Sequence, residues 1–118
     1  MSLRRPFLVV LFVLSATVLV PGEDPFDRIR RGDANNDGTV DFGDAIHIAN
    51  FLFNGGPAPL CEDAADANDD GAVDVADTSY LANWLFLGGP APPAPGPVSC
   101  GADPTADKLT CGYSVCSP

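Results

Sequence analysis

Two segments of the chain carry oxygen-bearing side chains at alternate positions around a central glycine. The first is residues 33–44 and the second is residues 66–77. In both, carboxylate or amide side chains occupy the first, third, fifth, ninth and twelfth places, and glycine occupies the sixth. A hard dication such as Ca²⁺ takes 6–8 oxygen ligands at about 2.3–2.6 Å, and a twelve-residue loop with this spacing can supply them. The two segments therefore predict two calcium-binding loops.

Twelve residues are the candidate metal ligands, six in each loop. They are Asp33, Asn35, Asp37, Thr39, Asp41, Asp44, Asp66, Asn68, Asp70, Ala72, Asp74 and Asp77. Thr39 and Ala72 would offer a backbone carbonyl, so their side chains are free to differ. Gly38 and Gly71 permit the positive φ that the sharp turn in mid-loop requires. We expect each loop to bind one Ca²⁺ ion, and the chain to bind two.

The two loops begin the two copies of an internal repeat. Residues 33–59 align with residues 66–92, and 17 of the 27 aligned residues are identical. After each loop the apolar residues recur at helical spacing, which gives two predicted core stripes, Ala45, Ile48, Ala49 and Leu52, and Thr78, Leu81, Ala82 and Leu85. Each helix would have only about 11 residues, so the stripes must pack on each other for stability. Gly55 and Gly88 are the expected helix ends.

The residues before each loop have too little apolar periodicity to form a full entering helix. Glu62–Ala65 allows at most one turn, and Pro25–Arg31 little more. Two EF-hand-type loops, each followed by one helix, resemble the dockerin module of bacterial secreted proteins over about residues 31–92. The resemblance implies an all-α fold with a small pair of antiparallel helices, each preceded by an EF-hand-type calcium loop. This chain adds a Pro/Cys-rich irregular tail.

The same resemblance implies a function in docking. Dockerins generally bind a cohesin partner through their helices and attach polysaccharide-degrading enzymes to a scaffold or cell surface. We therefore expect a calcium-binding docking or anchoring unit whose partner is a cohesin-like or other extracytoplasmic protein. The family often carries a Ser-Thr-like pair just before the last aspartate of the loop, and those places here hold Phe42-Gly43 and Val75-Ala76.

The alternative function is that of a stand-alone extracellular EF-hand protein, which binds calcium in a structural or buffering role and has no cohesin partner. We expect no enzyme activity, because the paired carboxylates that a glycosidase needs are used as ion ligands and no residues remain for a catalytic domain. The net charge is −10, from 6 Lys and Arg against 16 Asp and Glu. This balance argues against a nucleic-acid or anionic-membrane partner.

The N-terminus predicts a bacterial export signal. Arg4 and Arg5 precede the apolar run Phe7–Val20, which has about 14 residues and is shorter than the roughly 20 of a transmembrane helix. A retained membrane anchor is the alternative. We expect a secreted or extracytoplasmic chain with no stable membrane insertion after the signal is cleaved. The predicted divisions are a signal peptide (1–22), an N-terminal linker (23–31), the double calcium-binding repeat (32–97) and a cysteine-containing tail (98–118).

Four cysteines in an exported chain indicate disulfide bonds rather than a metal site. Three connectivities are possible. Cys61 and Cys100 each follow the Gly-Gly-Pro end of a repeat, which favours the pairs Cys61–Cys100 and Cys111–Cys116. The proline-rich run Pro90–Pro97 is expected to be extended, so that it leads the tail back along the module.

Overall fold

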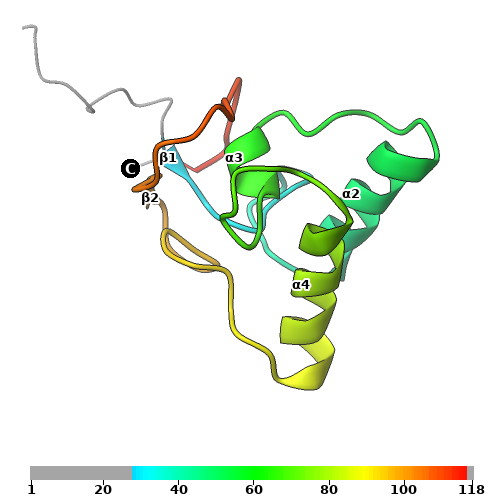
Figure 1. Cartoon of the computed structure of the whole chain (residues 1–118). Coiled ribbons are helices and arrows are strands. Elements are labelled where there is room, and N and C mark those ends of the chain that lie inside the picture. Colours follow the sequence, from blue (N-terminus) through cyan, green and yellow to red (C-terminus); the bar gives the residue numbers. More distant parts are fainter. Residues whose placement is uncertain (1–27, 117–118) are drawn as a thin grey trace, which may run out of the picture.

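A computed structural model describes residues 28–116 (Figure 1). Its elements are, in order, β1 (Arg28–Ile29), α2 (Phe42–Phe53), α3 (Glu62–Ala65), α4 (Val75–Leu87) and β2 (Gly101–Ala102). The predicted signal peptide (1–22) and the first part of the predicted linker lie outside the described residues. Within residues 28–116, none of the helices combines the length and the apolar character needed to cross a membrane.

Each long helix begins directly after a loop, at an aspartate that caps it. Asp41 is the N-cap of α2 and Asp74 is the N-cap of α4, and each side chain accepts a hydrogen bond from the backbone N–H two residues later. In return, the carboxylates of Asp44 and Asp77 accept from the N–H groups of these two N-cap residues. Such a reciprocal capping box satisfies backbone donors that the helix leaves unpaired. The same residues thus end the loop and start the helix.

The helix α4 ends at the predicted glycine, because Gly88 is its C-cap, whereas α2 ends at Phe53 with Asn54 as its C-cap, one residue before the predicted Gly55. Gly55 and Gly88 have a left-handed backbone, with φ of 70° and 73°. The N–H of the next glycine folds back in both cases and donates to the carbonyl oxygen of Asn50 (2.9 Å) or Asn83 (3.0 Å). A residue with a side chain is strained at this φ, so glycine is the residue that allows the chain to turn away here.

The core lies between α2 and α4, which pack against each other and run in opposite directions in Figure 1. From the predicted stripes, Ala45, Ile48 and Leu81 are fully buried and Leu52 is partly buried. Trp84, which is outside the stripes, also packs against this core. The core is completed by Ala34, Ala65 and Ala67. Alanines bury little apolar surface, so this core is small for its chain and needs further stabilisation from the loops and the disulfides.

The segments before the two loops are short, as predicted. One helical turn, α3, precedes the second loop, and β1 with its two residues precedes the first. A hydrogen bond from the N–H of Gly32 to the carbonyl oxygen of Ala64 (2.7 Å) joins the two segments. The helical content of the prediction is confirmed, whereas the small sheet described next was not predicted.

The proline-rich run leads the tail back along the module, as expected. The Tyr80 hydroxyl donates to the carbonyl oxygen of Ala91 (2.9 Å), and the backbone N–H of Arg31 donates to that of Pro95 (2.6 Å). The tail then forms β2, which pairs antiparallel with β1. The two ends of residues 28–116 therefore meet on one side of the helix pair (Figure 1).

The predicted disulfide pairing is wrong, because the bonds are Cys61–Cys111 and Cys100–Cys116. The backbone at Cys61 and the backbone at Cys111 form an antiparallel bridge, which brings these two cysteines together. Cys100 directly precedes β2 and is left to pair with Cys116. A place after the Gly-Gly-Pro motif shows only where a helix ends, whereas the pairing depends on backbone contacts between the tail and the start of α3.

Candidate metal centres

In the first loop, three carboxylates converge. One oxygen each from Asp33, Asp37 and Asp44 lie within 4.8 Å of one another. Asp33 and Asp44 are buried, with 3% and 0% of their surface exposed, whereas Asp37 is exposed. The first and twelfth residues of the loop therefore meet inside the protein, and the fifth residue faces solvent.

The second loop repeats this arrangement 33 residues later. One carboxylate oxygen each from Asp66, Asp70 and Asp77 lie within 4.8 Å of one another. Asp66 and Asp77 are fully buried and Asp70 is exposed. The structure thus brings together the first, fifth and twelfth predicted ligands of both loops.

Backbone N–H groups hold the first aspartate of each loop. Asp33 accepts hydrogen bonds from the N–H groups of Asp37 (3.1 Å) and Gly38 (2.9 Å). At the equivalent place Asp66 accepts the same two bonds, at 3.2 and 2.9 Å. These bonds wrap the chain around the carboxylate and so fix the direction in which its oxygens point.

The twelfth aspartate ties the two halves of the loop together. Asp44 accepts from the N–H groups of Asn35 (3.1 Å) and Asp41 (2.8 Å). Asp77 makes the same pair of bonds, at 3.3 and 2.9 Å. Because it stands in the first turn of the helix, its negative charge is also favoured by the helix N-terminus.

Four predicted ligands form the outer part of the loops. The side-chain oxygens of Asn35 and Asn68 each accept from the N–H of the fifth residue, at 3.2 Å in both loops. Thr39 and Ala72 are exposed, and their N–H groups donate to the carboxylate of that same fifth residue, at 3.0 and 3.1 Å. The third, fifth and seventh residues are therefore linked in a chain of short-range bonds.

The ninth residues lie outside the three-carboxylate clusters. Asp41 and Asp74 use their side chains to cap α2 and α4, and both are exposed. A ninth residue often reaches its ion through water, so this position is compatible with the predicted role.

Two residues in each loop turn the backbone through the left-handed region. Gly38 and Gly71, predicted for this purpose, have φ of 89° and 90°. Asn36 and Asp69, in the fourth place, have φ of 61° and 60° and were not singled out from the sequence. Asparagine and aspartate are the non-glycine residues that tolerate this conformation best. Their presence at the fourth place could therefore have indicated a left-handed backbone there.

The buried aspartates are costly to ionise. Burial raises the pKa of Asp44 to about 7, and repulsion from the neighbouring carboxylates adds to this rise, against the lowering effect of the backbone donors. The pKa of Asp77 is raised to about 7 for the same reasons. Burial likewise raises the pKa values of Asp33 and Asp66.

A divalent cation fits this set of donors. Among residues 28–116, no basic side chain forms an ion pair with any of the six clustered carboxylates. Their negative charges therefore lack a counter-charge from the protein, although the oxygens are converged and held by backbone donors. Binding of a dication would supply that charge and remove the repulsion.

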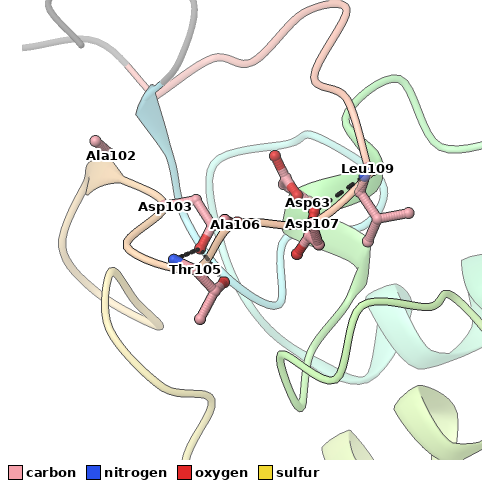
Figure 2. Close-up of a pocket in the computed structure, with 7 residues that line it drawn as sticks. All are labelled: Asp63, Ala102, Asp103, Thr105, Ala106, Asp107 and Leu109. Carbon is pink, nitrogen blue, oxygen red and sulfur yellow. Dashed lines mark hydrogen bonds between the residues drawn. The ribbon is translucent and has the colours of Figure 1, made fainter.

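A third group of carboxylates lies between α3 and the tail. Asp63, Asp103 and Asp107 line a cavity of about 250 Å³ (Figure 2). Burial, and then the charges of the other two aspartates, raise the pKa of Asp63 to about 7. This group differs from the loop clusters because Arg31 forms an ion pair with Asp103 at 2.7 Å. No spacing in the sequence indicates the group, since Asp63 is remote from the other two.

Arg31 is fully buried and joins the second loop to the tail. Its guanidinium forms ion pairs with Asp69 (3.3 Å) and Asp103 (2.7 Å). It also donates to the carbonyl oxygens of Asp66 (3.3 Å) and Pro93 (3.1 Å). Arg31 was not among the residues predicted from the sequence, although a pair of arginines just before a loop stands out in a chain with so few basic residues.

Comparison with known proteins gives one family. Residues 31–86 match the family described as the dockerin type I domain. The matched segment starts at Arg31, contains both loops, and includes all but the last residue of α4. No curated protein and no solved structure matches the chain.

Proposed function

We propose that this chain, whose residues 31–86 match the dockerin type I domain, is a non-catalytic unit that docks on another protein when calcium orders its two loops. The observation that carries the proposal is the pair of carboxylate clusters, which recur at a spacing of 33 residues with the same burial and the same backbone donors. Dockerin modules bind calcium and a cohesin partner, and the clusters give this chain oxygen donors of the kind that calcium prefers.

The proposed ligands are the twelve residues derived from the sequence, with one ion in each loop. Asp33, Asp37 and Asp44 would hold the first ion, with Asn35, the Thr39 carbonyl and Asp41 completing the set. Asp66, Asp70 and Asp77 would hold the second, with Asn68, the Ala72 carbonyl and Asp74. A bound ion supplies positive charge that lets the buried carboxylates stay ionised. Each loop begins its repeat and leads directly into the helix, so binding of an ion also fixes the helix relative to the core.

The helices offer a surface for a partner protein. The only formally charged residues of α2 and α4 are Asp44 and Asp77, and both are buried in the loops. Six large apolar side chains of these helices are exposed, here called the helical docking face: Phe42, Ile46, Phe53, Val75, Phe86 and Leu87. The rings of Phe42 and Phe86 touch edge to face, with centroids 5.3 Å apart. A concentration of exposed apolar side chains on two packed helices is typical of protein-interaction sites.

The chemistry of this face indicates the kind of partner. Exposed Asp37, Asp41, Asp70 and Asp74 lie in the loops at the starts of the helices. The partner should therefore present an apolar surface with basic side chains at its edge, since opposite charges steer association and like charges oppose it. Where many dockerins carry a Ser-Thr-like pair, this chain has Phe42-Gly43 and Val75-Ala76, so apolar contact replaces hydroxyl hydrogen bonds at those places.

By analogy with dockerin modules, we also propose that the partner is a cohesin-like extracytoplasmic protein and that the pair serves extracellular polysaccharide breakdown. The predicted export signal (1–22), the linker (23–31), the repeat (32–97) and the tail (98–118) belong to this proposal. Two features support export of the chain. An apolar run follows Arg4 and Arg5 near the N-terminus, and all four cysteines form disulfide bonds, which persist in oxidising compartments outside the cytoplasm.

A calcium-dependent pull-down tests the proposal. The mature chain is immobilised and exposed to extracytoplasmic extract, in calcium and in chelator. The proposal predicts a partner that is retained in calcium and released by chelator, and loss of that partner when Phe42 and Phe86 are both replaced by serine. Calcium binding without any calcium-dependent partner would instead support the stand-alone structural or buffering role. Absence of calcium binding would contradict both functions.

A further inference from the structure

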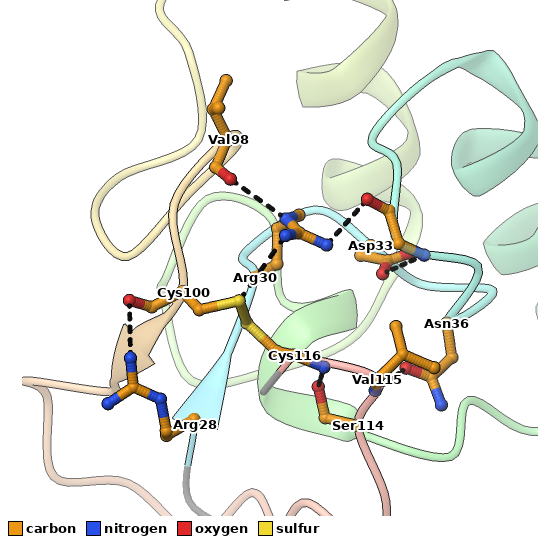
Figure 3. The surroundings of a disulfide bond; sticks show 10 residues. Arg28, Arg30, Asp33, Asn36, Val98, Cys100, Ser114, Val115 and Cys116 are labelled. Carbon is orange, nitrogen blue, oxygen red and sulfur yellow. Dashed lines mark hydrogen bonds between the residues drawn. A yellow bond between two sulfur atoms is a disulfide. The ribbon is translucent and has the colours of Figure 1, made fainter. Parts of the chain in front are cut away.

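The tail contacts the first loop at its fourth residue. The side-chain oxygen of Asn36 accepts from the backbone N–H of Val115 at 2.9 Å (Figure 3). Its amide nitrogen donates to the carbonyl oxygen of Tyr113 at 3.5 Å. Asn36 has a left-handed backbone and is not among the proposed metal ligands. These bonds therefore support the turn of the loop from outside and leave the ligand oxygens free.

The tail contacts the second loop at the equivalent residue. The carboxylate of Asp69, 33 positions after Asn36, accepts from the hydroxyl of Thr105 (2.7 Å). Asp69 also pairs with Arg31 (3.3 Å), which in turn pairs with Asp103 of the tail (2.7 Å). Different parts of the tail thus hold the same place in both loops, and each holds a residue whose φ is near 60°.

The mid-loop glycines lie beside the tail as well. A Cβ atom placed on Gly38 would be 3.8 Å from a methyl group of Val115, and one placed on Gly71 would be 3.8 Å from Asp107. The tail therefore lies beside the sharp turn of each loop, with room for about one methyl group between them. The hydrogen bonds at the fourth place and this close approach at the sixth place bring the tail to the turning segment of both loops.

Arg30 adds a second connection between the first loop and the tail. Its guanidinium donates to the carbonyl oxygen of Gly38 at 2.7 Å and to that of Val98 at 3.2 Å (Figure 3). It also reaches the sulfur of Cys100 at 3.5 Å. The Cys100–Cys116 bond then connects the segment that Arg30 contacts to the end of the segment that holds Asn36, so one covalent link joins the two contacts on the first loop.

From these contacts we infer that residues 98–116 form a clamp that preorganises both metal loops, and that the Cys100–Cys116 bond sets the calcium affinity of the first loop. The inference rests on the proposed binding of calcium by the loops. A loop already held in its turn loses less conformational freedom when an ion binds, so its affinity is higher. The second loop keeps Arg31, Thr105 and the Cys61–Cys111 bond when Cys100–Cys116 is absent, so its affinity should change less.

Calcium titration calorimetry on the full mature chain tests the clamp. The Cys100→Ser/Cys116→Ser variant should lose about tenfold in affinity at the first loop, the size expected when one or two supporting hydrogen bonds become dynamic. The second loop should stay within about twofold. Asp77→Asn and Asp44→Asn backgrounds, which weaken one loop each, assign the change to a loop.

A variant with both disulfides intact covers the case in which the cysteine variant does not fold. Asn36→Gly removes the side chain that the tail holds without straining the left-handed backbone at this position, and should lower first-loop affinity about fivefold. Asn83→Ala, an exposed asparagine within α4, is the matched control and should leave the affinity unchanged. Wild-type affinity in Asn36→Gly, or in a folded cysteine variant, overturns the clamp while calcium binding stands. No calcium uptake by the wild-type chain overturns the proposed function itself.

Discussion

Replacing Asp44 with asparagine separates two effects of this carboxylate, as a metal ligand and as a buried charge. The substitution keeps the shape of the side chain. Its amide oxygen can accept from one of the N–H groups of Asn35 and Asp41, and the bond from the other N–H is lost because the amide nitrogen cannot accept. One negative charge is lost from the first loop. Because Asp44 is fully buried, solvent cannot compensate for that loss, and the effect should have opposite signs with and without calcium.

The raised pKa gives the size of the effect in the metal-free chain. A pKa raised from 3.8 to about 7 corresponds to about 4 kcal/mol of free energy disfavouring the ionised carboxylate in the folded state. At pH 8 in chelator, Asp44→Asn should therefore be at least as stable as the wild type, by up to a few kcal/mol. With calcium, the variant loses an interaction with a charged group, typically about 1.5–3 kcal/mol, so first-loop affinity should fall roughly 10-fold to 150-fold.

Two measurements check these opposite effects. Urea unfolding in chelator gives the stability of the metal-free chain, and calorimetry in calcium gives the affinity. Asp41→Asn is the matched comparison, because asparagine is as good an N-cap as aspartate and the ninth residue lies outside the carboxylate cluster. It should lower affinity only a few-fold. Wild-type calcium affinity in Asp44→Asn would refute the assignment of Asp44 as a ligand.

Three further predictions concern pH, Arg31 and the helical docking face. In chelator, the free energy of unfolding should rise as the pH falls from 8 to 5. The reason is that Asp44, Asp63 and Asp77 have pKa values of about 7 in the folded chain against 3.8 otherwise, and so take up protons on folding. Urea titrations at both pH values measure this, and a flat or reversed profile would contradict it. Arg31→Met should cost about 3–5 kcal/mol of stability, because it leaves Asp69 and Asp103 without their buried partner. Thermal unfolding in calcium measures the loss, with the same substitution at the partly exposed Arg28 as the control. A change below about 1 kcal/mol would contradict the role of Arg31. The double variant Phe42→Ser/Phe86→Ser should bind the partner about 30-fold or more weakly, while its calcium affinity stays within twofold of the wild type. Leu60→Ser is the control, because Leu60 is exposed but lies outside the helices. Undiminished binding of the partner by the double variant would place the docking surface elsewhere.

The features that the sequence predicted correctly are those encoded over short distances. The helix starts follow from aspartates at fixed spacing. Gly88 caps α4 as predicted, and Gly55 follows the C-cap of α2 by one residue, both with a left-handed backbone. The stripe that contains Ile48 and Leu81 was readable because helical periodicity is local. The ligand set could be proposed in the same way, and the structure gathers the first, fifth and twelfth residues of both loops.

The features that the sequence did not predict depend on contacts between distant segments. Cys61 pairs with Cys111 because the tail forms a backbone bridge with the start of α3, and nothing near either cysteine encodes that bridge. Arg31 is buried by groups from the second loop and the tail, more than 30 positions away in sequence. Asn36 looked like an ordinary loop residue because its partner, Val115, lies in a segment with no repeat or periodicity.

Crystals grown in calcium test the central claim most directly, through anomalous scattering from the bound ions. We predict two anomalous peaks for each chain, one among Asp33, Asp37 and Asp44 and one among Asp66, Asp70 and Asp77. Well-ordered loops without such peaks, at calcium concentrations well above those outside a cell, would contradict the claim that captured metal organises this fold.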